Sequence, residues 1–198
     1  AKISTDKVQT QRVKRIGERI AKAANRPDFN WEFNLIDDPQ VNAWCMPGGK
    51  VVVYTGILKM AKNDDQLATV MSHEVSHALA RHGAERMSHQ KISSGVQQAA
   101  NLLLGATAPE YTNAFNLAYG VGTQYGVMLP YGRSHEYEAD EIGIHLMKKA
   151  GYNINEAPKF WQNMKAANPN APMEFLSTHP SDDNRIKKIS QTIESLEK

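Results

Sequence analysis

The stretch VMSHEVSHALARHG at residues 70–83 holds two histidines, His73 and His77, four residues apart, with Glu74 directly after the first. Apolar residues surround these polar ones, which predicts a helix that is largely buried. Because an α-helix turns by about 100° per residue, the two imidazoles lie about 40° apart and one turn along, where both can reach one metal ion. Glu74 is then placed to accept a proton from a metal-bound water. The alternative is a buried histidine pair satisfied by ordinary hydrogen bonds.

A catalytic zinc site normally has three protein ligands and one position for water, so a third ligand is needed. If the same helix continues, His82 and His89 face about 180° and 160° away from His73. The metzincin pattern needs a glycine and a third histidine where this sequence has Ala80 and Gly83. The third ligand is therefore expected to be a distant carboxylate.

The segment HEYEADEIG at residues 135–143 offers such a carboxylate. Glu136 and Asp140 are four residues apart on one helical face, whereas Glu138 and Glu141 point away from that face. We expect Glu136 to bind the metal. Asp140 is expected to accept the second ring N–H of a liganding histidine, which fixes the orientation of that ring. The alternative for these acidic residues is a solvated helix face.

Composition narrows the class of protein. The formal net charge of +2 gives no reason to expect nucleic-acid binding. A single cysteine, Cys45, excludes an internal disulfide and is expected to be buried. No apolar run approaches the roughly 18 residues that span a bilayer. The chain begins without an initiator methionine or an apolar signal core, so we expect a mature or trimmed form.

Helical and strand patterns predict an α+β fold that is mostly helical, in a single domain covering residues 1–198. Residues 13–24 have the apolar spacing of an amphipathic helix, and residues 31–36, 41–46 and 50–55 are predicted to be short strands. The sheet is expected to contain about three to four strands and to pack near the helix that carries His73. The sequence Pro47-Gly48-Gly49 suits a tight turn between two of these strands.

Residues 92–132 contain one charged side chain, that of Glu110, and several glycines. This composition predicts a buried helical hairpin or a cover over the site. The alternative is a surface that docks on a membrane or on a protein partner.

Several motifs together resemble a known family. The segments HEVSHALARH, RSHEYEADEIG and LSTHP, with VNAWCMPGGKVVVYTGIL upstream, resemble those of the HtpX, BepA and LoiP-type zinc metallopeptidases, which are gluzincins distantly related to the CAAX prenyl proteases. The resemblance implies a zincin-like fold and one Zn²⁺ per chain, bound by His73, His77 and Glu136, with Glu74 as the catalytic base. It also implies a segment beside the active cleft that contains Asn42, Ala43, Pro47, Gly48 and Gly49.

The resemblance also implies a location and partners. Membrane-embedded members of this family carry transmembrane helices, and this sequence has none, so it resembles the soluble bacterial branch. We therefore expect the bacterial periplasm, a lipid anchor through a segment preceding residue 1, and outer-membrane assembly partners.

The sequence thus predicts a zinc-dependent metalloendopeptidase that cleaves unfolded or misassembled polypeptides. Val51 and Val53 are expected on an edge strand that an extended substrate joins through backbone hydrogen bonds. The alternative is a central strand that is already paired on both sides. Two other functions stay open: a zinc aminopeptidase, for which we identify no acidic anchor, and a chaperone-like or adaptor protein with little turnover.

His179, in the segment STHP, is the first candidate to stabilise the oxyanion of the reaction, and Arg133 and Tyr137 are weaker ones. The resemblance implies another role, because a histidine at this position can approach the zinc as a fourth ligand that restrains activity. A third interpretation is that His179 caps the final helix.

Overall fold

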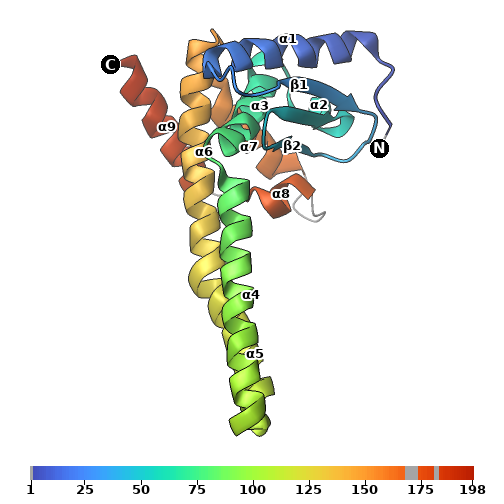
Figure 1. The fold of residues 1–198 in the computed structure, drawn as a ribbon. Coiled ribbons are helices and arrows are strands. Elements are labelled where there is room, and N and C mark those ends of the chain that lie inside the picture. The colour runs from blue at the N-terminus through green and yellow to red at the C-terminus, as the bar shows by residue number, and fades with distance from the viewer. Residues whose placement is uncertain (1, 168–173, 181–182) are drawn as a thin grey trace. The chain divides into compact units, whose positions relative to one another are not determined.

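The computed structural model describes residues 2–167, 174–180 and 183–198. The chain divides into two compact units: unit 1 comprises residues 1–80 and 136–198, and unit 2 comprises residues 81–135. The described residues confirm a mostly helical fold with a small sheet (Figure 1). The expectation of a single metallopeptidase domain stays a prediction.

The sheet lies in unit 1 and has three strands in the described part of the chain: β1 (Glu32–Ile36), β2 (Ala43–Met46) and β3 (Lys50–Tyr54). β3 is central and pairs in parallel with β1 and antiparallel with β2. The turn between β2 and β3 depends on Gly48 and Gly49, whose φ angles of 92° and 103° are ones that glycine adopts readily.

The expectation that residues 50–55 form an edge strand is wrong. Val51, for example, pairs with Phe33 of β1 and with Cys45 of β2. The side chains of Val51 and Val53 are both fully buried. They are therefore core residues rather than substrate contacts, because the β3 backbone has no free edge. Apolar periodicity does not separate central from edge strands, since the neighbouring strands are set by tertiary structure.

Helix α1 (Lys7–Ala24) packs on β1 and on the helix that carries the histidine motif (Figure 1). It begins at Asp6, whose carboxylate accepts a hydrogen bond from the backbone N–H of Gln9. Its fully buried residues are Val13, Ile16 and Ile20, which confirms the helix expected from their spacing.

Helix α3 (Asp64–Leu79) is the central helix of unit 1 and carries the motif. Asn63 caps it by accepting a hydrogen bond from the N–H of Gln66 at 2.8 Å. Every residue from 66 to 76 is buried, since α1, β2 and α7 (Glu156–Ala167) surround the helix. The motif is thereby held rigidly in a low-dielectric environment.

Helix α3 ends earlier than expected. Arg81 has a left-handed φ of 59°, and α4 (His82–Thr107) begins directly after it. The expectation that His82 and His89 lie on the motif helix is therefore wrong: a left-handed residue interrupts the helix, and both histidines belong to α4 in unit 2.

The rest of unit 1 is helical. It contains α2 (Thr55–Met60), α7, α8 (Glu174–Thr178), α9 (Asp183–Glu197) and the part of α6 (Leu129–Lys149) that follows residue 135. Phe160 and Trp161 of α7, with Ile189 of α9, complete the core around α3. Among the described residues, no helix has both the length and the apolar character needed to cross a membrane.

Unit 2 is a helical hairpin. Helix α4 packs against α5 (Thr112–Thr123), which follows the short turn η1 (Pro109–Tyr111), and the π-helical turn η2 (Gln124–Met128) leads into α6 (Figure 1). The expected hairpin is thus confirmed, but its expected burial is wrong. The structure describes every residue from 83 to 129, and none of them is buried.

Candidate metal centre

The two motif histidines meet a carboxylate from α6. His73 and His77 lie one turn apart on α3, with their Nε2 atoms 3.1 Å from each other. Glu136 approaches both rings: Oε2 lies 3.2 Å from Nε2 of His73, and Oε1 lies 3.2 Å from Nε2 of His77. The structure therefore brings together the three side chains that were expected to share one metal ion.

His179 joins this cluster from the residue directly after α8. Its Nδ1 lies 3.3 Å from Nε2 of His73 and 3.1 Å from Oε1 of Glu136. Its other ring nitrogen, Nε2, lies 3.5 Å from Oε1 of Glu74. His179 is thus within reach of both the metal-ligand cluster and the expected catalytic base.

The weaker oxyanion candidates, Tyr137 and Arg133, have less support. The ring of Tyr137 lies 3.9 Å from Nζ of Lys188. Arg133 is exposed and belongs to unit 2. His179 is therefore the candidate whose distance to Glu74 supports a role in the reaction.

The four donor atoms of His73, His77, Glu136 and His179 suit a divalent metal ion and lie within 4.8 Å of one another. Zinc bonds of about 2.0–2.1 Å to nitrogen and oxygen place tetrahedral ligand atoms about 3.3 Å apart. The distances of 3.1–3.3 Å that the donor atoms of His73 and Glu136 make with one another and with the other two residues match that value. Imidazoles with a carboxylate are ligands for several divalent metals, so the chemistry of the donors fits zinc without being unique to it.

Asp140 and Arg185 form a second layer behind His73. Nδ1 of His73 lies 2.9 Å from Oδ1 of Asp140, an arrangement that turns Nε2 of the same ring toward the cluster. Arg185 donates two hydrogen bonds to Asp140, from Nε to Oδ2 at 2.8 Å and from Nη2 to Oδ1 at 2.7 Å. Its guanidinium also lies 4.1 Å from the ring centre of Trp161 and 3.1 Å from Oε2 of Glu136. Arg185 therefore fixes both carboxylates.

Arg185 is the functional residue that sequence reasoning missed. A signal was present, because Arg185 stands four residues before Ile189 and eight before Ile193, on the apolar face of the closing helix. Arginine at such a position is almost never buried without a partner. In the structure it is 2% exposed.

Burial and hydrogen bonding give the two motif histidines opposite charge states. Burial lowers the pKa of His77 to about 3. Burial also opposes the charge on His73, but hydrogen bonds to Asp140 and Glu136 outweigh it and raise its pKa to about 9. Burial likewise opposes ionisation of Glu136, yet hydrogen bonds from His179, His73 and His77 hold its pKa well below the ordinary range. In the metal-free protein His73 therefore favours the protonated, charged form and His77 the neutral form.

Glu74 lies beside the cluster and is 2% exposed. Burial raises its pKa, with the nearby histidines acting in the opposite direction. Its Oε1 has no hydrogen-bond partner in the described part of the chain. A buried carboxylate oxygen that accepts no hydrogen bond, and whose ion-pair contact with Nε2 of His179 is 3.5 Å long, is suited to accept a proton or hydrogen bond from water or substrate.

The segment expected beside the cleft divides between two places. Strand β2 begins at Ala43 and packs against α3. Cys45 on the same strand is half-buried, and burial together with the charge of Glu74 raises its pKa to about 12. Gly49, in contrast, packs beside Trp31, and the space next to Gly48 is open. β2 is thus the part of this segment that lies along the metal helix.

Comparison with known proteins places the chain in a family. It matches the profile of peptidase family M48 over residues 7–193. It is 38% identical over 183 residues to the mitochondrial metalloendopeptidase OMA1 of Schizosaccharomyces pombe, covering 90% of this chain and 51% of that protein. It is 31% identical over 191 residues to the beta-barrel assembly-enhancing protease of Escherichia coli, covering 94% of this chain and 39% of that protein. The chain therefore spans about half, or less, of the length of these relatives. Because the family match extends over nearly all of its residues, the chain belongs to peptidase family M48.

Proposed function

We propose that this chain is a zinc-dependent metalloendopeptidase. The observation that carries the proposal is the convergence of His73, His77 and Glu136 at 3.1–3.2 Å, with Glu74 adjacent. Two of the relatives are named as a metalloendopeptidase and a protease, and these names agree with the proposal.

A zinc ion held by these three residues would act as a Lewis acid and lower the pKa of water to about 7. Glu74 accepts the proton of the water whose oxygen attacks the peptide carbonyl carbon. As the C–N bond breaks, Glu74 returns that proton to the amine nitrogen that leaves. Its raised pKa suits both steps, because a carboxylate of ordinary pKa is a weaker base. Asp140 and Arg185 keep the ring of His73 in the binding orientation.

We assign His179 the role of a fourth ligand that restrains activity. Its Nδ1 lies 3.3 Å from Nε2 of His73 and 3.1 Å from Oε1 of Glu136, distances that would suit a fourth ligand of the same metal ion. A water molecule needs that position for catalysis. On this assignment His179 must move before substrate is cleaved. The alternative role is oxyanion stabilisation, and the 3.5 Å distance between Nε2 of His179 and Oε1 of Glu74 supports it because the ring lies beside the proposed base.

We propose that substrate pairs with β2 rather than with β3. In the three-stranded sheet β2 is an outer strand, and it packs against the metal helix. An extended peptide added to this edge would gain backbone hydrogen bonds that do not depend on its side chains. Such binding suits unfolded or misassembled polypeptides as substrates. The Escherichia coli relative's name refers to β-barrel assembly, which supports outer-membrane proteins as one source of these chains.

A periplasmic location stays a prediction. One relative is named as mitochondrial and another comes from Escherichia coli, so the comparisons do not select a compartment.

The substitution Glu74→Gln tests the function. It should preserve metal content, because Glu74 is not a ligand, and reduce hydrolysis of unfolded casein by about 10²–10⁴-fold, the usual contribution of a general base. The matched control is Glu141→Gln, which neutralises an exposed carboxylate on α6. Undiminished hydrolysis by the Glu74→Gln variant would remove Glu74 from the mechanism.

A second measurement separates the alternatives. Cleavage of peptides with blocked amino termini supports an endopeptidase, whereas a requirement for a free amine would indicate an aminopeptidase. If the Glu74→Gln variant prevents aggregation of an unfolded protein as well as the wild type does, binding without turnover becomes the better description.

A further inference from the structure

Trp161 on α7 is a large apolar neighbour of the metal cluster, and its side chain is 1% exposed. The centre of its ring lies 5.4 Å from the centre of the His73 ring, and the two ring planes make an angle of 73°. The guanidinium carbon of Arg185 lies over the same indole, 4.1 Å from its centre. One side chain therefore contacts both a proposed metal ligand and the arginine that holds Asp140 and Glu136.

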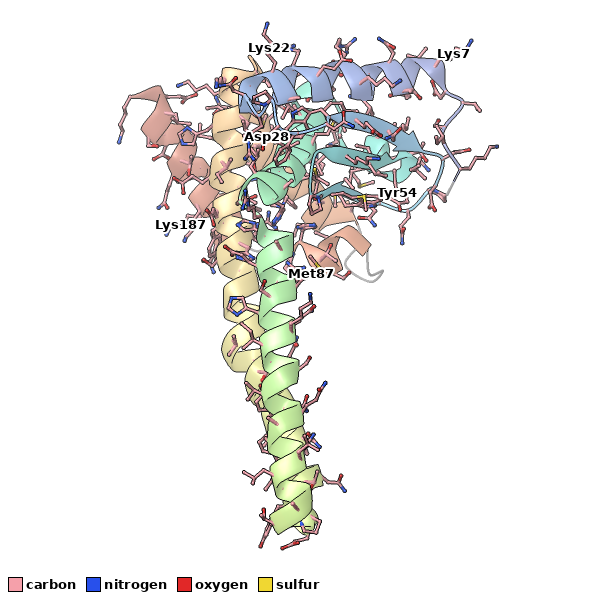
Figure 2. The ribbon with its side chains drawn as sticks, in the orientation of Figure 1. Lys7, Lys22, Asp28, Tyr54, Met87 and Lys187 are labelled. Carbon is pink, nitrogen blue, oxygen red and sulfur yellow. The ribbon has the colours of Figure 1, made fainter. Side chains whose placement is uncertain are left out.

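The indole restrains Arg185 in a direction that its hydrogen bonds leave open. The guanidinium is planar, and it donates to Asp140 from Nε and Nη2, two groups that lie in its plane. These bonds resist movement within the plane more than movement out of it. The face of an aromatic ring attracts a cation placed over it, and this attraction is larger where water is excluded. The contact is specific to the inner side of α9, because Lys187, two residues further along the helix, is exposed (Figure 2).

His73 is restrained by the same indole. Its Nδ1 lies 2.9 Å from Oδ1 of Asp140, a contact that fixes the direction of Nδ1 but permits the ring to turn about it. The indole packs against the imidazole at 73° and limits that turn. Nε2, the proposed metal-binding atom, is thereby kept toward Glu136, whose Oε2 lies 3.2 Å away. Groups that orient a liganding histidine in this way contribute to metal affinity.

We propose that Trp161 is a positioning residue of the metal centre, which holds Arg185 against Asp140 and so keeps His73 in the orientation that binds zinc. The inference rests on the proposed zinc site, and it differs from a role in core packing alone. A core residue supports the folded state, whereas a positioning residue also affects the zinc dissociation constant. The two roles therefore predict different results for substitutions that remove buried volume.

The substitution Trp161→Leu removes the aromatic face and should raise the zinc dissociation constant of the 198-residue chain by about tenfold or more. Trp161→Phe keeps a ring over which the guanidinium can lie, so its constant should stay within about threefold of the wild-type value. The matched control is Ile20→Ala, which removes fully buried volume from α1, a helix that supplies no side chain to the cluster. This control should lower the urea midpoint of the metal-free chain, as Trp161→Leu does, but leave the zinc dissociation constant unchanged. Competition with a chromophoric chelator measures the constant, and far-UV circular dichroism verifies that each variant is folded before zinc is added.

A double substitution tests whether Trp161 acts through Asp140. In an Asp140→Asn background the contact with Arg185 is already weakened, so adding Trp161→Leu should change the zinc dissociation constant by less than about threefold. Multiplication of the two separate effects would overturn the inference, as would an unchanged constant for Trp161→Leu or a wild type that binds no zinc. Equal losses of affinity in Trp161→Phe and Trp161→Leu, or in Ile20→Ala and Trp161→Leu, would also overturn it. None of these measurements involves hydrolysis, so a chain that binds zinc but is unaffected by Glu74→Gln would refute the proposed mechanism and leave this inference standing.

Discussion

Zinc binding should release close to one proton at pH 8, and that proton should come from His73. The pKa of His73 is raised to about 9 in the metal-free protein, so about 0.9 of its molecules carry the extra proton at pH 8. His77, with a pKa of about 3, and Glu136, with a pKa below its ordinary range, have no proton to lose at this pH. Because a ligand must present a lone pair to the metal, the extra proton of His73 is displaced.

The same charge state of His73 sets how the zinc affinity depends on pH. Protons compete with zinc wherever metal-free His73 is protonated, so affinity rises as pH rises toward 9 and then levels off. This competition changes the dissociation constant by about tenfold per pH unit, or about 1.4 kcal/mol. The number of protons released should fall from about 0.9 at pH 8 to about a quarter at pH 9.5.

Calorimetric titration in two buffers of different ionisation enthalpy measures the proton count directly, with zinc supplied from a chelator whose own contribution is measured separately. Asp140→Asn should lower both the proton count and the affinity, because it removes the acceptor that raises the pKa of His73. The expected loss of affinity is about 10–100-fold, as for other groups that orient a ligand. Glu141→Gln is the control with the same loss of charge. Release of no proton at pH 8 would refute the charge state assigned to His73, and release of two would show that a second ligand is also protonated.

Three further predictions concern the same cluster. His179→Ala should weaken zinc binding but raise the rate of casein hydrolysis at saturating zinc; slower hydrolysis would instead support the oxyanion role. The metal-free chain should be most stable to urea near pH 6.5. Above this pH, the stability that comes from the raised pKa of His73 is lost as the pH rises through 9. Below it, the lowered pKa of His77 makes the stability fall as the pH drops from 6.5 toward 3. A midpoint that rises steadily to pH 9 would contradict this. Arg185→Gln should cost about 3–5 kcal/mol in the free energy of unfolding, because it removes the guanidinium charge and its two hydrogen bonds from the buried carboxylate of Asp140. Lys187→Gln, at an exposed position, should change it by less than about 0.5 kcal/mol.

The sequence was most informative where chemistry and local geometry coincide. The spacing of His73 and His77 fixes their relation on any helix, because the four-residue interval is a property of the helix itself. The spacing of Glu136 and Asp140 does the same on α6, and the structure has one carboxylate facing both imidazoles and the other facing Nδ1 of His73. What remained unknown was the distance between the two helices, which depends on packing.

The order of the strands in the sheet could not be predicted from the spacing of apolar residues. All three strands were predicted, yet β3 was assigned to the edge of the sheet instead of its centre. Its second neighbour, β1, pairs with it in parallel, and apolar periodicity does not reveal that pairing. A strand with apolar residues at 51, 52 and 53 is more often central than peripheral. That run of three valines was the available signal, and it favoured the alternative that the structure bears out.

The burial of the helical hairpin in unit 2 could not be predicted from its composition. Apolar residues without charge were interpreted as buried, which is the usual outcome for one chain considered alone. In the structure α4 directs Gln97 and Asn101 toward Asn116 and leaves Ile92, Val96 and Leu103 exposed. A seven-residue apolar repeat predicts that a helix will be covered, but it does not say by which chain. The exposure of these side chains is therefore a property of the tertiary arrangement of unit 2, which the spacing of apolar residues along one helix does not determine.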